Sequence, residues 1–168
     1  MIANSEFLSG CSSRLAIAVI FLATLLPAAA EQSVPPPAPA PGSPATYVTR
    51  QQLTDKLKAA AAIPSDPALS PIGVSDKYSI QEVHRGKPGP PAMHHGWTEL
   101  HFILEGSGTF VTGGQITRVP GGAESIIEGG ISRKVQKGDA VIVAPDTPHW
   151  YKTIDGSLTY LEVRFVAP

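Results

Sequence analysis

Apolar and polar side chains alternate with a period of two residues along much of the chain beyond residue 77. This period is typical of strands that are buried on one face, whereas an amphipathic helix repeats after three or four residues. The predicted strands are 78–85, 100–104, 109–112, 131–136, 140–143, 149–154 and 158–166. Turn-forming residues separate several of them and predict a hairpin turn at 105–108 and a further turn at 155–156. Short strands at this spacing predict an all-β fold, either a double-sheet sandwich or a barrel.

A single helix is predicted over residues 50–62. Thr49 is followed three residues later by Gln52, the capping-box pattern in which each side chain bonds the other residue's backbone N–H. Leu53 and Leu57 begin an apolar stripe, and Pro64 ends the helix. We expect this helix to pack on the outside of the β domain.

The first thirty residues have the pattern of a secretory signal peptide. Arg14 precedes the apolar run 15–26, which is short for a membrane span because a spanning helix needs about twenty residues. Pro27 and three alanines follow, as at a cleavage site. We therefore predict a signal peptide at 1–30 that is cleaved after Ala30, a proline-rich linker at 31–46, and one β domain with its N-terminal helix at 47–168. The product would be periplasmic or secreted, without a stable membrane anchor after cleavage.

Composition narrows the structural and functional classes. The chain contains 16 glycines and 17 prolines and is only 16% charged, a balance that favours a β protein with many turns. Its net charge is −1 and it has no basic block, so nucleic acid and anionic membranes are poor partners. The single cysteine, Cys11, lies inside the predicted signal peptide, so disulfides cannot stabilise the exported domain.

Two segments, 93–108 and 138–149, carry the residues that could bind a metal. Glu99 and His101 are two residues apart on a predicted strand, so both side chains can enter one cavity. His149 follows a proline-bounded turn at the start of another strand, and two histidines precede the first strand. Neutral imidazole and carboxylate groups are suitable ligands for zinc, iron, manganese, nickel or copper. These residues could form a site of three or four ligands with an open coordination position.

The two segments resemble the paired motifs of the cupin superfamily. Glu99 and Gly106 are separated by six residues, as in the second half of the first cupin motif. Gly138 and His149 have the spacing of the second motif, although Asp146 replaces its usual glycine. The resemblance implies a single cupin β-barrel, jelly-roll-like with two sheets, and one bound divalent transition metal: Fe, Mn, Zn, Ni or Cu.

The first motif departs from the family pattern at its histidines. The usual His-x-His is replaced by Met93-His94-His95, so one of the family's usual ligands is missing in either register. Small single-domain cupins that resemble this chain often carry one histidine five positions before the acid, which favours His94. The alternative register uses His95, which shares strand parity with Glu99 and His101. His101 could supply the missing nitrogen, or it could contact substrate or hydrogen-bond a ligand.

The resemblance therefore implies the metal ligands His94, Glu99, His101 and His149, with His95 as the alternative to His94. Glu99 could also act as a base. Trp97, Tyr151 and His95 could line a substrate pocket.

The implied function is that of an exported metal-binding protein with a small-molecule ligand or substrate. A metal-dependent dioxygenase that acts on a small oxygen-rich or aromatic molecule is the leading reaction. A sugar-binding cupin without catalysis and a metal-dependent isomerase or lyase are the alternatives, so enzymatic activity stays open. Because cupins often dimerise through strand edges, which need protection, a homodimer is also expected.

Overall fold

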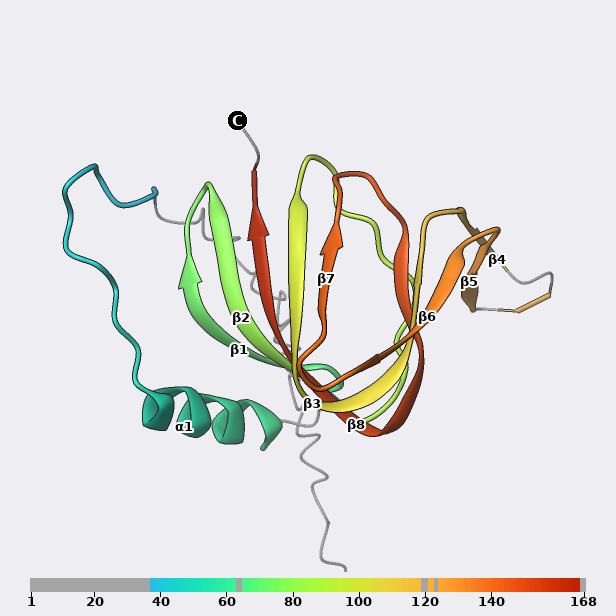
Figure 1. The fold of residues 1–168 in the computed structure, drawn as a ribbon, viewed down its shortest axis with the longest axis horizontal. Coiled ribbons are helices and arrows are strands. Elements are labelled where there is room, and N and C mark those ends of the chain that lie inside the picture. The colour runs from blue at the N-terminus through green and yellow to red at the C-terminus, as the bar shows by residue number, and fades with distance from the viewer. Residues whose placement is uncertain (1–36, 63–64, 119–120, 123, 167–168) are drawn as a thin grey trace, which may run out of the picture. The chain divides into compact units, whose positions relative to one another are not determined.

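The computed structural model describes residues 37–62, 65–118, 121–122 and 124–166 (Figure 1). The predicted signal peptide lies outside the described residues, as does the first part of the predicted linker. The described elements are α1 (Arg50–Ala61), β1 (Ala68–Val74), β2 (Tyr78–Arg85), β3 (Thr98–Thr112), β4 (Gln115–Arg118), β5 (Ser125–Glu128), β6 (Ile131–Gln136), β7 (Ala140–Val143) and β8 (His149–Phe165).

Antiparallel pairing joins six of the strands into one curved sheet. Its order is β1-β2-β8-β3-β6, and β7 also pairs with β3. The sheet curls so that β3 and β8 run through both halves of the domain, and β7 and β6 continue the wall on one side (Figure 1). The predicted all-β architecture with one short helix is confirmed. The segment 113–130, to which no strand was assigned, instead contains a separate hairpin of β4 and β5.

The two longest strands correct the prediction of a hairpin at 105–108 and a turn at 155–156. Both turn sequences lie inside continuous strands, β3 and β8, which pair with each other along most of their length. Gly106 and Gly156 have positive φ angles, 84° and 80°, and the β3–β8 register shifts around Gly106. The glycines therefore form bulges that bend a strand, instead of turns that reverse it.

Gly106 also allows the two strands to approach each other closely. A Cβ atom at this position would collide with the backbone carbonyl of Ser157 on β8. The bend at Gly106 is thus specified by both its backbone conformation and the absence of a side chain.

The interior is built by alternate residues of the long strands. Its buried side chains are Val83, Ile103, Phe110, Val135, Val143, Tyr151, Leu158 and Tyr160. Each apolar side chain of this size stabilises the fold by about 1.5–3 kcal/mol when fully buried. On β8 the same alternation that places Leu158 and Tyr160 inside continues to Glu162, so the end of this strand brings polar groups into the interior.

Helix α1 begins at the predicted cap and packs against β1 and β2 on the outside of the sheet. Thr49 and Gln52 form the capping box, and the helix ends at Ala61, one residue before the predicted end. Lys56 fixes the helix to β1 by donating to the carbonyl of Pro71 at 2.9 Å. In the described part of the chain, no helix has the length and apolarity needed to cross a membrane.

Candidate metal centre

The candidate site lies on the inner face of the sheet where β3 and β8 pair. Glu99 is directly opposite Arg164 in the register, and His101 is opposite Glu162. Directly opposed residues of an antiparallel pair project to the same face, so all four side chains meet inside the domain. Glu99 is 1% exposed and His101 is 2% exposed.

His94 reaches the same place from the segment that precedes β3. Ala92 and His149 exchange two backbone hydrogen bonds of 2.9 Å, which pin this segment to the start of β8. The Asp146 N–H donates to the His94 carbonyl at 3.2 Å. These bonds hold His94 beside His149, with 5.5 Å between their ring centroids.

Two imidazole nitrogens converge on one oxygen of Glu99. Its Oε1 lies 3.8 Å from His94 Nε2 and 3.7 Å from His149 Nε2. The three donor atoms lie within 4.8 Å of one another, a separation at which they could hold one metal ion. Two imidazoles and one carboxylate are also the donor set of the facial triad of non-haem iron sites.

The hydrogen bonds around His149 leave its inward nitrogen free to bind a cation. Nδ1 lies 3.0 Å from the Thr147 carbonyl, which can only accept, so Nδ1 carries the proton and Nε2 presents a lone pair towards Glu99. Burial lowers the pKa of His149, and burial followed by the nearby Arg164 lowers the pKa of His94. Two neutral imidazoles therefore face a carboxylate oxygen, an arrangement that a cation between them would stabilise.

The second oxygen of Glu99 belongs to a different cluster. Its Oε2 lies 3.3 Å from His101 Nε2, which is also 3.5 Å from Glu162 Oε2. These residues could by themselves form a second metal-binding group. However, Arg164 Nε already lies 3.4 Å from Glu99 Oε2 and 3.0 Å from Glu162 Oε1, so a guanidinium supplies the positive charge there.

His101 connects the carboxylates to Tyr151. Its Nδ1 is 3.1 Å from the Tyr151 hydroxyl. His101 Nε2 faces the carboxylates of Glu99 and Glu162, which accept, so Nε2 carries the proton and Nδ1 accepts from the Tyr151 hydroxyl. Burial raises the pKa of Tyr151 far above its ordinary value, so the phenol keeps the proton that it donates. Although burial alone would raise the pKa of Glu99, the contacts with His101, His149, Arg164 and His94 lower it below its ordinary value, so Glu99 is a carboxylate.

The structure brings the two sequence motifs together at this cluster. The Gly138 N–H donates to the Ile103 carbonyl, and the Ile103 N–H donates to the Asp139 carbonyl, both at 2.9 Å. These bonds join the start of the second motif to the strand of the first, and the last residue of the second motif, His149, faces Glu99. The two segments that resemble the cupin motifs therefore form opposite sides of one interior site within the curled antiparallel sheet.

Comparisons with solved structures give partial alignments at low sequence identity. No family model matches the chain, and no curated protein is significantly similar. Among solved structures, an RmlC-like cupin from Shewanella frigidimarina aligns at 14% identity and a TM-score of 0.44, covering 62% of this chain and 80% of that one. The protein HppE with Co(II) and substrate aligns at 16% identity and a TM-score of 0.47, over 60% of this chain and 52% of its own. The DMSP lyase DddQ from Ruegeria pomeroyi aligns at 21% identity and a TM-score of 0.43. The alignment covers 62% of this chain and 49% of DddQ.

Two residues expected from the sequence lie away from the cluster. The His95 side chain is 81% exposed and contacts Asp146 Oδ1 at 2.7 Å. Strand β3 begins at Thr98, so the strand parity that favoured His95 does not extend back to it. Trp97 does not line the inner cavity either, whereas Trp150 does, with its indole N–H bonded to the Gly89 carbonyl at 2.6 Å.

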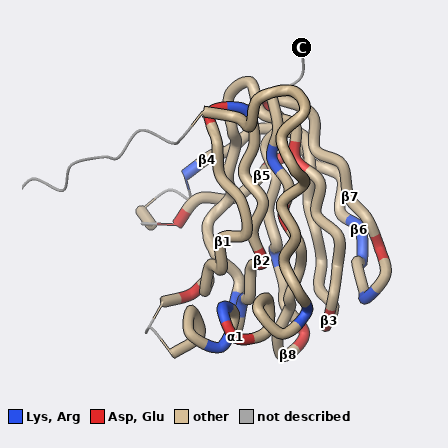
Figure 2. Tube along the Cα trace, turned by 90° about the vertical axis from the view of Figure 1, so that its left-hand side faces the viewer, with Lys and Arg blue, Asp and Glu red and all other residues tan. Residues whose placement is uncertain are grey.

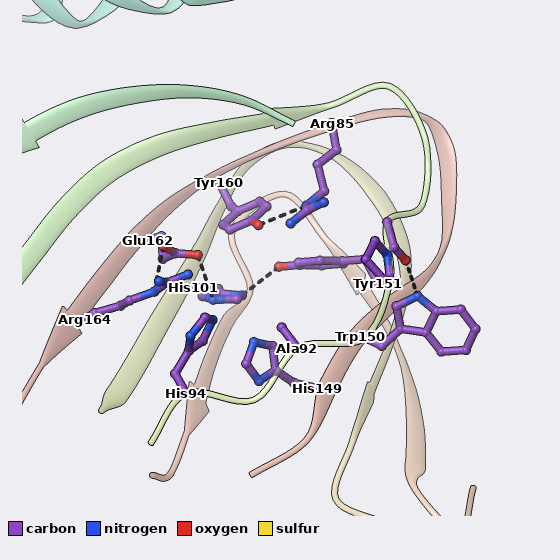
Figure 3. A pocket seen from close by; sticks show the side chains of 12 residues that line it. Arg85, Ala92, His94, His101, His149, Trp150, Tyr151, Tyr160, Glu162 and Arg164 are labelled. Carbon is purple, nitrogen blue, oxygen red and sulfur yellow. Dashed lines mark hydrogen bonds and ion pairs between the residues drawn. The ribbon is translucent and has the colours of Figure 1, made fainter. Parts of the chain in front are cut away.

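The inner cavity beside the donors is small. It measures about 50 Å³ and is lined by His94, His101, His149, Tyr151 and Tyr160, with arginines at 85 and 164 and the strap of residues 89–92 (Figure 3). A larger cavity of about 370 Å³ lies beyond Gly89, Pro90 and Trp150, next to β5. The three residues line both cavities and form the wall between them.

The sequence interpretation missed the polar residues of β8. Glu162 is 4% exposed, accepts from Gln81 at 2.6 Å and lies beside His101. The signal was the alternation Tyr160, Glu162, Arg164 at the end of the last strand, in which a period-two inner face changes from apolar to charged. Charged residues on the inner face of a strand need partners, so they indicate a polar site.

Proposed function

We propose that the protein is a metal-dependent enzyme, with a dioxygenase reaction on a small oxygen-rich molecule as the leading activity. The arrangement of His94, Glu99 and His149 around one carboxylate oxygen carries this proposal. A divalent metal at these three residues would supply Lewis-acid chemistry and open coordination positions, as facial-triad sites do. Iron, manganese, zinc, nickel and copper all suit imidazole and carboxylate donors.

The surrounding residues would orient the ligands and keep their charge fixed. The Thr147 carbonyl holds the His149 ring in the tautomer that a ligand needs. His101 and Arg164 bind the second oxygen of Glu99 and thereby direct the first oxygen towards the two imidazoles. Because both oxygens of Glu99 have partners, we assign Glu99 to metal binding in preference to the role of a base.

The size of the inner cavity favours small substrates over large aromatic ones. A cavity of about 50 Å³ has room for roughly three to five water-sized groups, at about 10–15 Å³ each. A flavonoid or a sugar ring would need the Gly89–Trp150 wall to open. A short oxygen-rich molecule fits the space as it stands.

Metal analysis followed by oxygen uptake tests the proposal. Protein purified without a histidine tag should bind about one equivalent of a divalent transition metal, and folded His149→Ala should bind below about a tenth of an equivalent. Oxygen consumption with a panel of short hydroxy acids, oxo acids and catechols then tests the reaction. Failure of the wild type to bind any of the metals refutes the enzyme proposal. Full metal binding without oxygen uptake supports the isomerase or lyase alternative, and ligand binding without metal supports a binding protein.

We also propose that the protein is exported to the periplasm or secreted, and that it forms a homodimer. The signal-peptide pattern supports export, and N-terminal sequencing from a bacterial expression host should find Glu31 first. The outer face of the sheet supports dimerisation, because Phe102, Ile142 and Phe165 project from it and are exposed. The four residues of β7 are all apolar, whereas β6 carries Arg133 and Lys134 (Figure 2). Light scattering should give a dimer mass that Ile142→Lys reduces to a monomer.

A further inference from the structure

Arg85 lies at the end of the inner cavity opposite His94 and His149 (Figure 3). Its Nε–H donates to the Tyr160 hydroxyl at 3.1 Å, and its Cζ lies 5.9 Å from the centre of the Tyr151 ring. These contacts orient the guanidinium but do not neutralise it. In the described part of the chain, Arg85 makes no ion pair with an Asp or Glu, whereas Arg164 faces both Glu99 and Glu162.

The charge balance of the cavity changes when a metal binds. With neutral histidines, the guanidiniums of Arg85 and Arg164 balance the carboxylates of Glu99 and Glu162. A bound divalent cation would leave its own charge uncompensated beside the buried side chains of Glu99 and His149. Buried charges are stabilised by a partner of opposite sign, so the loaded cavity favours an anionic ligand.

The donors that Arg85 can offer fit a carboxylate. A guanidinium presents a planar fork of N–H groups, and Nε is the single donor that Tyr160 occupies. The terminal N–H groups stay available for the two oxygens of a carboxylate. Gly89 lies against the guanidinium, where an added Cβ would be 3.0 Å from Arg85 Nη1.

We propose that Arg85 binds the carboxylate of a short-chain acid whose other oxygen-bearing end points towards His94 and His149. A cavity of about 50 Å³ limits this acid to roughly two to four carbons. Arg85 is then the residue that selects substrates by charge, and the Gly89–Trp150 wall selects them by length. The assignment rests on the proposed metal-dependent function, because the bound metal creates the need for an anion.

Calorimetry with matched small molecules tests the assignment. Zinc-loaded protein is used because zinc has no redox chemistry. The probes are acetate, glycolate and the neutral analogue acetamide. The wild type should bind acetate and glycolate more tightly than acetamide. Arg85→Gln should weaken binding of both acids by roughly tenfold to a hundredfold, since a hydrogen-bonded charge is lost, and should leave acetamide binding unchanged.

Three further variants separate direct contact from indirect effects. Arg133→Gln removes a charge from the exposed face of β6 and should bind acetate like the wild type. Tyr160→Phe removes the partner of Arg85 Nε but keeps the guanidinium, and should weaken acetate binding by less than about threefold. Arg85→Lys keeps the charge but loses the planar fork of N–H donors, so its acetate affinity should lie between those of Arg85→Gln and the wild type. This variant also provides the test if Arg85→Gln does not fold.

The outcomes distinguish this inference from the proposed function. Equal acetate affinity of Arg85→Gln and wild type, both with zinc bound, overturns the role of Arg85. Loss of acetate binding in Tyr160→Phe to the same extent as in Arg85→Gln also overturns it, because Arg85 would then act only by positioning Tyr160. If the wild type binds none of the divalent metals, the proposed function is refuted, and the Arg85 assignment is overturned with it because the charge that calls for an anion is missing. Unchanged acetate affinity in zinc-loaded Arg85→Gln overturns the Arg85 assignment alone and leaves the metal site standing.

Discussion

His94→Ala and His95→Ala each remove one imidazole from adjacent positions, yet the structure predicts opposite effects on metal binding. His94 Nε2 lies 3.8 Å from the carboxylate oxygen that it shares with His149, whereas the His95 side chain is 81% exposed and contacts Asp146. Loss of a residue that only orients a ligand costs about 10–100-fold in metal affinity, so loss of a ligand should cost at least about 100-fold.

The affinity loss translates into a measurable change in stability. At a free metal concentration of 100 times the wild-type Kd, binding stabilises the folded protein by about 2.7 kcal/mol. A variant with 100-fold weaker affinity is then half saturated and gains only about 0.4 kcal/mol. His94→Ala should therefore lose most of the metal-dependent increase in free energy of unfolding, and His95→Ala should retain it.

Urea unfolding with and without added zinc, with free zinc buffered at a fixed concentration, measures both values. The reasoning is refuted if His95→Ala loses the zinc-dependent stabilisation, or if His94→Ala keeps it. Metal content measured on the same samples separates a lost site from a lost fold.

Three further changes test the scaffold by urea unfolding. In Gly106→Ala, the new Cβ collides with the Ser157 carbonyl, and alanine must also adopt a φ of 84°. The free energy of unfolding should fall by more than about 3 kcal/mol, or the protein should not fold; an unchanged value would contradict the bulge. Thr49→Ala removes the cap to Gln52 N and should cost about 1 kcal/mol, whereas an unchanged midpoint would mean that α1 contributes little. Burial raises the pKa of Glu82 above its ordinary value of 4.5, so the folded state binds this proton more tightly than the unfolded state does. The folded state therefore loses stability as the pH rises from 4.5 through the raised pKa. Glu82→Gln should therefore stabilise the protein at pH 7 but have little effect near pH 4; an equal gain at both would count against this cause.

The sequence predicted the strands whose pattern is local and missed features that depend on distant partners. Period two in 78–85 and the capping box at Thr49 are properties of neighbouring residues, and both elements formed close to their expected bounds. The sequence around Gly106 is the same whether the glycine reverses a strand or bends it. Its role was decided by Ser157, about fifty residues further along the chain, whose carbonyl occupies the space of a side chain.

The candidate site shows the same division. Glu99 and His149 could be selected from motif spacing. Motif spacing favoured His94 over His95, and the structure brings His94 to Glu99 through the Ala92–His149 backbone bonds, which the spacing does not contain. Whether His101 faces a metal or the second oxygen of Glu99 depended on Glu162 and Arg164, which come from a strand about sixty residues away.

The segment 93–97, which carries His94, lies outside the strands, so this donor can change separately from the sheet. Glu99 and His149 belong to strands whose loss would disrupt the fold, but His94 lies between the Ala92 bridge and the start of β3, outside any strand. Substitutions in this short segment can change the first donor while the sheet stays intact. Selection could therefore alter the donor set one residue at a time, and the adjacent His95 is a spare imidazole within reach of a single-residue deletion.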